Sequence, residues 1–165
     1  MKIIQKHAQN LRIYYYDLNN PIKEEPIKKY HMGKATILDF IRSYFYGNTK
    51  LNFMRWLVRK DDYFIIRDRN TIIAWARICY KSTKEVELGS KQASLISGFT
   101  VKAYRNRGMH TALIKQMMIY LKNKGFKRCI VWAEENNMAS RAVIEKNQFT
   151  LVSSPPKNID VPLGE

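Results

Sequence analysis

A short turn late in the chain combines two arginines with a glycine, directly before a segment of helical periodicity; its residues are Arg105, Asn106, Arg107, Gly108, Met109 and His110. The first turn of an α-helix has backbone N–H groups without a partner inside the helix, and the helix dipole makes this end attractive to anions. Because Gly108 has no Cβ, a ligand can approach the main chain closely there. The turn is therefore predicted to cradle an anion such as a phosphate.

Two common phosphate-binding motifs do not explain this turn. A P-loop requires Gly-x-x-x-x-Gly-Lys-Ser/Thr, which the sequence lacks. The dinucleotide fingerprint requires three glycines in a first strand–helix–strand unit, whereas this turn has one glycine and lies late in the chain. Both classes of nucleotide site are excluded.

The turn lies between a predicted strand and a predicted helix. Residues 91–101 form an apolar strand, in which Gly98 is expected to mark a bulge or a close backbone approach. Residues 108–124 form an amphipathic helix that ends at Gly125. Its apolar face consists of Leu113, Ile114, Met117, Met118 and Leu121. This helix supplies the free N-terminus that the anion site needs.

Three further elements are predicted after this helix. Residues 127–133 read as a buried strand, Asn137 and Ser140 precede a last helix, and a closing strand covers residues 149–153. Prolines follow it and disfavour further regular structure.

The first ninety residues predict a strand, two helices and a β-hairpin, in that order: residues 11–16, 35–46, 51–58, and 62–68 joined to 71–80 by Arg69-Asn70. In the first helix Ile37, Leu38 and Ile41 recur at helical spacing, and Gly47 closes it. The order of elements predicts a mixed α+β fold.

Composition indicates one domain over residues 1–165, in a chain with 45% hydrophobic residues. No apolar stretch approaches the roughly 20 residues that span a bilayer, and the N-terminus does not resemble a signal peptide. Cys79 and Cys129 lie in apolar runs and read as buried thiols in a reducing compartment. No metal-ligand spacing is present. We expect a cytoplasmic protein without a metal site.

The formal charge of +15 is concentrated around the turn. Between Glu87 and Glu134 the chain has no acidic residue but nine basic ones. Such a field attracts polyanions. It is compatible with two classes of function: an enzyme with an anionic co-substrate, and a basic module that binds nucleic acid or the ribosome.

The turn resembles the pyrophosphate-binding signature of the GNAT superfamily of N-acetyltransferases, Gln/Arg-x-x-Gly-x-Gly/Ala, which follows a strand ending in Val and opens a long helix. Arg105 and Gly108 match its spacing, and Phe99, Val101 and Tyr104 stand where such proteins carry similar residues. The later segment WAEENNMASRAVIEKNQF also resembles the family's strand–Asn–helix segment, at Asn137, Ser140, Glu145, Lys146 and Phe149. The resemblance covers residues 91–153, the donor-binding half, and the earlier residues only by their order of elements.

The resemblance implies a GNAT-like, mostly antiparallel sheet flanked by helices on both faces, with acetyl-CoA as co-substrate and an amine as acceptor. Main-chain groups of Phe99 and Val101 would pair with the pantetheine amides, the amides from Arg107 to Thr111 would wrap the pyrophosphate, and Asn137 would touch the pantetheine arm. The implied donor-binding residues are Phe99, Val101, Arg105, Asn106, Arg107, Gly108, Met109, His110, Thr111, Asn137 and Ser140.

The chain departs from the family pattern at several positions. His110 replaces the final Gly/Ala of the signature, so its ring either points away from the pyrophosphate or donates a hydrogen bond to it. Ile144 stands where many members carry a Tyr that protonates the leaving thiolate. The strand over residues 91–101 has no carboxylate to act as base, so Glu87 is the predicted catalytic base, with Glu85 or a water held by Ser97 or Tyr80 as alternatives.

The chain is also short after its last predicted strand, where the family usually adds another. The substrate wall is then either open or completed by a second subunit in a homodimer. The loops and helices over residues 21–60 would line the acceptor side, and they carry no motif that identifies the amine. A scaffold that binds acyl-CoA as a sensor without turnover is a further alternative.

Overall fold

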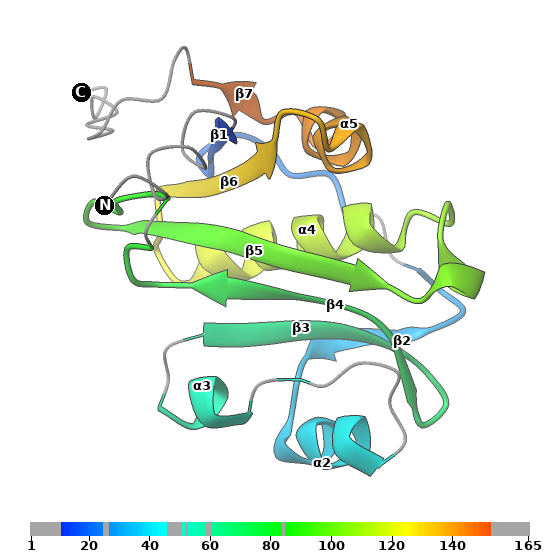
Figure 1. The fold of residues 1–165 in the computed structure, drawn as a ribbon. Helices are drawn as coiled ribbons and strands as arrows, with labels where there is room; N and C mark the ends of the chain where they lie inside the picture. The colour runs from blue at the N-terminus through cyan, green and yellow to red at the C-terminus, as the bar shows by residue number, and fades with distance from the viewer. Residues whose placement is uncertain are drawn as a thin grey trace, which may run out of the picture.

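A computed structural model of the chain describes residues 11–24, 27–45, 51, 53–58, 61–83 and 85–152 (Figure 1). Seven strands form one sheet in the order β2-β3-β4-β5-β6-β1-β7. Their bounds are β1 Leu11–Asp17, β2 His31–Lys34, β3 Asp61–Asp68, β4 Thr71–Cys79, β5 Gln92–Thr100, β6 Arg128–Glu134 and β7 Thr150–Leu151. Every pairing is antiparallel except that of β5 with β6. The predicted mixed, mostly antiparallel sheet is confirmed.

Helices cover both faces of this sheet, as predicted (Figure 1). Helix α2 (Ile37–Phe45) and helix α3 (Phe53–Leu57) pack over one face, where Phe40 and Trp56 join a cluster with Tyr63 and Ile65 of β3. Helix α4 (Met109–Asn123) and helix α5 (Met138–Lys146) cover the other face and form the main core with it.

Helix α4 is the central element of the larger core because its apolar face is almost completely removed from water. Leu113, Met117 and Leu121 are at most 1% exposed and pack with Phe64 and Ile66 of β3. Its C-terminal end closes on Gly125 at φ +78°, where the N–H of Phe126 donates to Leu121 O (3.1 Å). The N–H of Gly125 donates to Lys122 O (2.9 Å). The two bonds form a Schellman motif, which confirms Gly125 as the predicted helix stop.

The N-terminal strand β1 occupies a position that the sequence did not predict. It lies between β6 and β7 and pairs antiparallel with both, so that Tyr14 is opposite Val131 on one side and Leu151 on the other. The place beside β6 is therefore filled by the chain's own first strand. The predicted end of the last strand at Ser153 lies outside the described residues.

Two smaller differences concern the sheet edge and its helix. Strand β2, with sequence HMGK, was not predicted, because four residues at an edge show no apolar alternation. The apolar spacing correctly predicted helix α2, but the face that it marks is exposed, with Ile37 at 51% and Leu38 at 56%, while Phe40 and Ser43 of the same helix are buried. The predicted stop at Gly47 lies outside the described residues.

Both cysteines are free and buried, as predicted. Within the described ranges, no helix combines the length and the apolar composition that crossing a bilayer requires.

Candidate donor-binding site

Strands β5 and β6 run side by side for only three residue pairs and then diverge. Gln92–Ser94 pair with Arg128–Ile130, after which β5 follows β4 and β6 follows β1. Among the described residues, one edge of β5 therefore has no strand partner beyond Ser94. The two strands therefore diverge in the middle of the sheet, and we call the space between them the opening.

Because β5 and β6 are parallel, their carboxyl ends lie at the same end of the sheet, and the helices that follow them begin there (Figure 1). Helix α4 follows β5 through a short 3-10 turn, Lys102–Tyr104, and helix α5 follows β6 directly. The N-terminal ends of both helices are thus placed beside the opening. Two positive dipole ends at one opening favour an anionic ligand.

The N-terminus of α4 has the features of an anion cradle. Gly108 is its N-cap residue in the left-handed conformation (φ +75°, ψ 3°), and no side chain of the described residues caps the helix. The first helical bond runs from the N–H of Ala112 to Gly108 O (3.0 Å), so the N–H groups before Ala112 have no partner within the helix. A Cβ built on Gly108 would meet no heavy atom within 4 Å, so the approach to the main chain is open. We call this N-terminal end, residues 105–111, the cradle.

The two arginines of the cradle are exposed and are held by neutral partners. Arg105 Nε donates to Thr100 O (3.1 Å), which ties the turn to the end of β5. The Arg107 guanidinium lies 5.5 Å from the centre of the Tyr104 ring. None of the ion pairs between described residues involves either arginine. Their charge is therefore available to a ligand. Asn106 adopts φ +60°, the left-handed backbone that its residue type was expected to tolerate.

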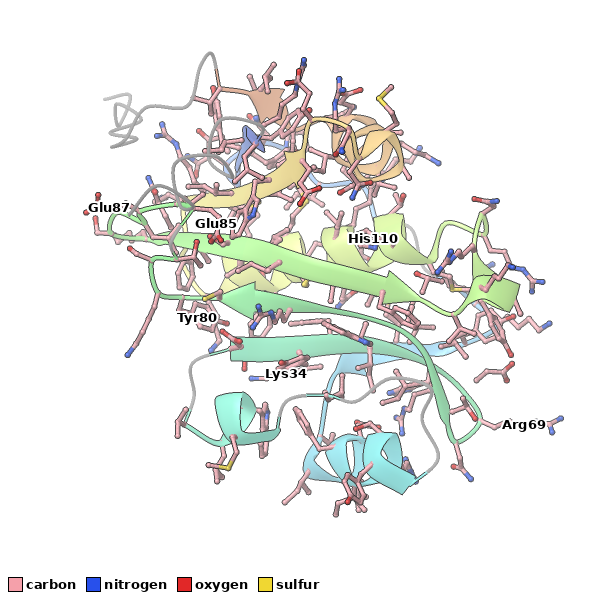
Figure 2. The ribbon with its side chains drawn as sticks, in the orientation of Figure 1. Lys34, Arg69, Tyr80, Glu85, Glu87 and His110 are labelled. Atoms are coloured by element: carbon pink, nitrogen blue, oxygen red, sulfur yellow. The ribbon has the colours of Figure 1, made fainter. Side chains whose placement is uncertain are left out.

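The His110 ring packs against the main chain of Gly98, on β5. A Cβ built on Gly98 would lie 1.5 Å from His110 Cε1, so the ring fills the space that a side chain would need (Figure 2). Burial lowers the pKa of His110 below its ordinary value, which favours the neutral ring. The ring thus points away from the cradle, which is the first of the two predicted orientations. It faces the sheet and leaves the cradle clear.

Gly98 also marks the predicted irregularity in β5. The pairing with β4 shifts register between Trp75 and Arg77, which indicates a bulge opposite Ala76. Both residues of this contact were noted in the sequence, as a glycine inside a strand and a histidine in place of a small residue. Nothing in the local sequence pattern showed that the two are in contact.

The structure corrects the prediction that Val101 offers its main chain to the donor. Its N–H donates to Ile73 O (2.9 Å) and its C=O accepts from the N–H of Tyr104 (2.8 Å), so both groups are occupied. Since successive peptide groups of a strand point to opposite sides, Phe99 also faces β4, where it is paired with Trp75. Thr100, between these two residues, faces the opening instead.

The other predicted binding residues of α4 can offer a ligand only their main chain. The side chains of Met109 and Thr111 are only 2% and 4% exposed, so only their N–H groups can reach a ligand at the cradle.

At the start of α5, Asn137 is the N-cap residue, and its Oδ1 accepts from the N–H of Ser140 (3.0 Å). Ser140 lies within the helix and does not precede it as predicted. The cap leaves the Nδ2 group of the exposed Asn137 for a ligand at the opening. Ile144 is buried at 2% exposure in the main core, so this position offers no acid.

The candidate bases lie at the other end of the sheet. Glu85 and Glu87 are exposed on the loop before β5, at the end where β5 and β6 are paired (Figure 2). Tyr80 lies at the same end and donates to Asp62 Oδ2 (2.6 Å). The structure therefore does not bring Glu87, Glu85 or Tyr80 to the cradle. The side chain of Ser97 lies outside the described part of the chain.

Solved structures share this fold at low sequence identity. A GCN5-related N-acetyltransferase from Sphaerobacter thermophilus is 14% identical over 92% of this chain and 52% of its own, with a TM-score of 0.61. The ribosomal-protein-S18-alanine N-acetyltransferase from Escherichia coli is 14% identical over 75% of this chain and 79% of its own (TM-score 0.56). An aminoglycoside N-acetyltransferase in complex with CoA is 14% identical over 80% of this chain and 98% of its own (TM-score 0.57).

The chain spans between 47% and 60% of the lengths of three of the solved proteins that it matches. No functionally curated protein matches its sequence. Residues 27–149 match the acetyltransferase (GNAT) family, and this range includes the diverging strands, the cradle and the cap of α5. The chain belongs to the acetyltransferase (GNAT) family.

Proposed function

We propose that this protein is an N-acetyltransferase that transfers an acetyl group from acetyl-CoA to a primary amine. The observation that carries this proposal is the uncapped N-terminus of α4 beside the divergence of β5 and β6. The free N–H groups and exposed arginines suit a pyrophosphate, and the open edge of β5 suits an extended, amide-bearing arm. Coenzyme A carries both groups.

In this proposal each part of the donor has its own contacts. The amides from Arg107 to Thr111 wrap the pyrophosphate, and Arg105 and Arg107 add charge. The N–H of Thr100 pairs with the pantetheine arm in place of the main chain of Phe99 and Val101, and Asn137 Nδ2 donates to the arm from α5. A main-chain N–H on the open edge of β5 stabilises the oxyanion that develops on the thioester carbonyl.

The chemical step is direct attack. The neutral amine nitrogen forms a bond to the thioester carbon, and the tetrahedral intermediate then breaks its C–S bond to release coenzyme A as a thiolate. The attacking nitrogen loses its proton to solvent. A thiolate with a pKa of about 8.5 leaves without an acid catalyst, which is compatible with the buried Ile144. Glu87 has no part in this mechanism because it lies at the other end of the sheet.

The acceptor is proposed only as a chemical class. With a formal charge of +15, the protein repels polycationic amines and attracts amines that carry a carboxylate or belong to an acidic particle. The buried free thiols of Cys79 and Cys129 suit the reducing cytoplasm, where we place the protein.

Calorimetric titration with acetyl-CoA and with desulfo-coenzyme A tests donor binding, and thiol release with a panel of primary amines tests transfer. We expect micromolar binding of both ligands and amine-dependent thiol release. Absence of binding at low salt would refute the proposal. Binding without thiol release for any amine would favour an acyl-CoA sensor, the alternative that the missing acid at Ile144 suggests.

A further inference from the structure

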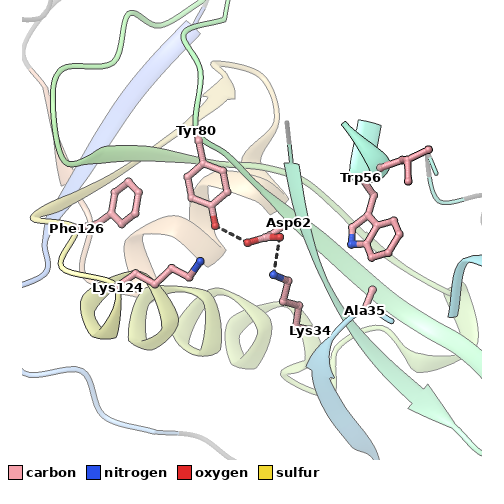
Figure 3. Close-up of a pocket in the computed structure, with 8 residues that line it drawn as sticks. Lys34, Ala35, Trp56, Asp62, Tyr80, Lys124 and Phe126 are labelled. Carbon is pink, nitrogen blue, oxygen red and sulfur yellow. Dashed lines mark hydrogen bonds and ion pairs between the residues drawn. The ribbon is translucent and has the colours of Figure 1, made fainter. Parts of the chain in front are cut away.

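A second candidate site lies at the opposite end of α4 from the cradle. A cavity of about 700 Å³ is lined there by Lys34, Trp56, Asp62, Tyr80, Lys124 and Phe126 (Figure 3). We call it the lysine pocket. Helix α4 has 15 residues, so the two sites are about 22 Å apart along its axis. The lysine pocket is therefore separate from the proposed donor site. Two of its residues, Lys34 and Trp56, lie within residues 21–60, which the sequence predicted to line the acceptor side.

The pocket exists because two neighbouring strands end at different levels. Strand β2 ends at Lys34, which is paired with Phe64, whereas β3 begins three residues earlier, at Asp61. The first residues of β3 therefore extend beyond β2. Helix α3 lies on one side of the resulting space, through Trp56, and the end of α4 lies on the other.

The floor of the pocket is a fixed carboxylate. Asp62 accepts hydrogen bonds from Tyr80 Oη (2.6 Å) and Tyr120 Oη (2.9 Å) and forms an ion pair with Lys34 Nζ (2.8 Å) (Figure 3). Burial alone would raise the pKa of Asp62, but these hydrogen bonds lower it, so the group is ionised. Because three donors already contact the carboxylate, its charge and hydrogen-bonding capacity are satisfied without a cationic ligand.

Among the described residues that line it, the pocket has two cations and one anion. Lys34 Nζ and Lys124 Nζ lie 5.4 Å and 5.0 Å from the centre of the same Tyr120 ring. Lys34 is neutralised by Asp62, whereas no carboxylate of the described residues forms an ion pair with Lys124. Two ammonium groups thus face one carboxylate, and a ligand with a single negative charge would balance them.

The walls of the pocket are aromatic. Trp56 lies against Phe40, with ring centres 4.9 Å apart, and Phe126 lies against Tyr80 at 5.5 Å. These contacts hold the two rings in place on opposite sides of the charged floor (Figure 3). A flat apolar body would therefore find preformed surfaces on both sides of the anion.

We propose that the lysine pocket binds a small organic acid, a carboxylate on an aromatic body, with its charge at Lys124 and its ring between Trp56 and Phe126. A phosphate monoester fits less well because its charge of nearly two exceeds the single uncompensated cation.

Titration of the full chain with benzoate, benzamide and benzylamine tests this proposal. These three probes share one shape and carry a negative, neutral or positive charge. Benzoate should bind at roughly millimolar concentration, and benzamide and benzylamine at least about ten times more weakly. Equal affinity for benzoate and benzamide, tighter binding of benzylamine, or no binding of benzoate would overturn it.

Two lysine variants locate the binding. Lys124→Met should weaken benzoate binding by about tenfold or more, because it removes the pocket cation that has no ion pair with a described carboxylate. Lys127→Met is the matched control, since Lys127 is exposed, carries the same charge and does not line the pocket. Circular dichroism verifies that both fold. An equal loss in both variants would show a general charge effect and would refute the assignment, whereas coenzyme A binding should be unchanged in Lys124→Met.

Discussion

The two ends of α4 differ in how their polar and charged groups are paired. At the N-terminal end, Gly108 leaves the N–H groups free, and Arg105 and Arg107 have only neutral partners. At the C-terminal end, the last turn is closed on Gly125, and the cation Lys34 is held by Asp62. One end therefore offers a diffuse positive charge to a multiply charged ligand, and the other offers a compact pocket with a single uncompensated charge.

Two glycines separate the effect of backbone strain from the effect of the cradle. Gly108 and Gly125 have nearly the same backbone, at φ +75° and φ +78°, and a Cβ on either would meet nothing within 4 Å. Gly108→Val and Gly125→Val should each lower the free energy of unfolding by about 1–2 kcal/mol, measured by urea denaturation. Only Gly108→Val should also weaken coenzyme A binding, by about 100-fold, because its side chain fills the cradle.

An equal loss of coenzyme A affinity in the two glycine variants would mean that general destabilisation, and not the cradle, controls donor binding.

Charge reversal should have the next largest effect. Arg107→Glu should weaken coenzyme A binding by about tenfold to thirtyfold, because it replaces an exposed cation beside the pyrophosphate by an anion. Lys127→Glu makes the same change in net charge at the other end of α4 and should change the affinity by less than about threefold. Similar losses in both, measured by calorimetry at one salt concentration, would contradict a local site.

The contact of His110 with Gly98 predicts a size compensation. Gly98→Ala forces the ring to move and should lower the free energy of unfolding by about 1.5 kcal/mol. In the double variant Gly98→Ala with His110→Ala, the new methyl group enters space that the ring has left. The double variant should therefore lose less stability than the sum of the two single variants, as measured by urea denaturation. Additive losses would show that the two residues do not compete for one space.

The smallest effect is a pH dependence of stability. Burial lowers the pKa of His110 in the folded protein, whereas in the unfolded chain its pKa is about 6.5. At pH values between these two pKa values the unfolded chain binds a proton that the folded chain does not. The free energy of unfolding should therefore fall as the pH is lowered from 7.5 to 5.5. The decrease should be smaller in His110→Ala; the same decrease in both proteins would assign it to other groups.

The sequence predicted the elements around α4 better than the order of the strands. Apolar periodicity identified α4, β5 and β6 because these elements are long and buried on a regular face. The place of β1 between β6 and β7 depends on contacts between the two ends of the chain, and local patterns contain no information on such pairing. Strand β2 is too short and too exposed to show a period.

The sequence predicted the parts of the candidate site that depend on the backbone conformation a residue type favours. It did not predict the parts that depend on the direction in which a main-chain group points. Gly108 and Asn106 have the left-handed backbone that their residue types favour, and Asn137 caps its helix as Asn commonly does. Which strand residues face the opening depends on the hydrogen-bond register, so the sequence suggested Phe99 and Val101 where the structure has Thr100. The lysine pocket unites four distant segments, and no local motif marks it.

The assignment of the cradle as the donor site is tested most directly by NMR. The ¹⁵N-labelled protein is titrated with coenzyme A, and the chemical shift of each backbone amide is followed. We expect large shifts for Gly108, Met109, His110 and Thr111, smaller shifts along Gly98 to Thr100, and none at Lys34 or Lys124. Shifts concentrated at the lysine pocket, or spread evenly over the basic surface, would contradict the assignment of the cradle as the donor site.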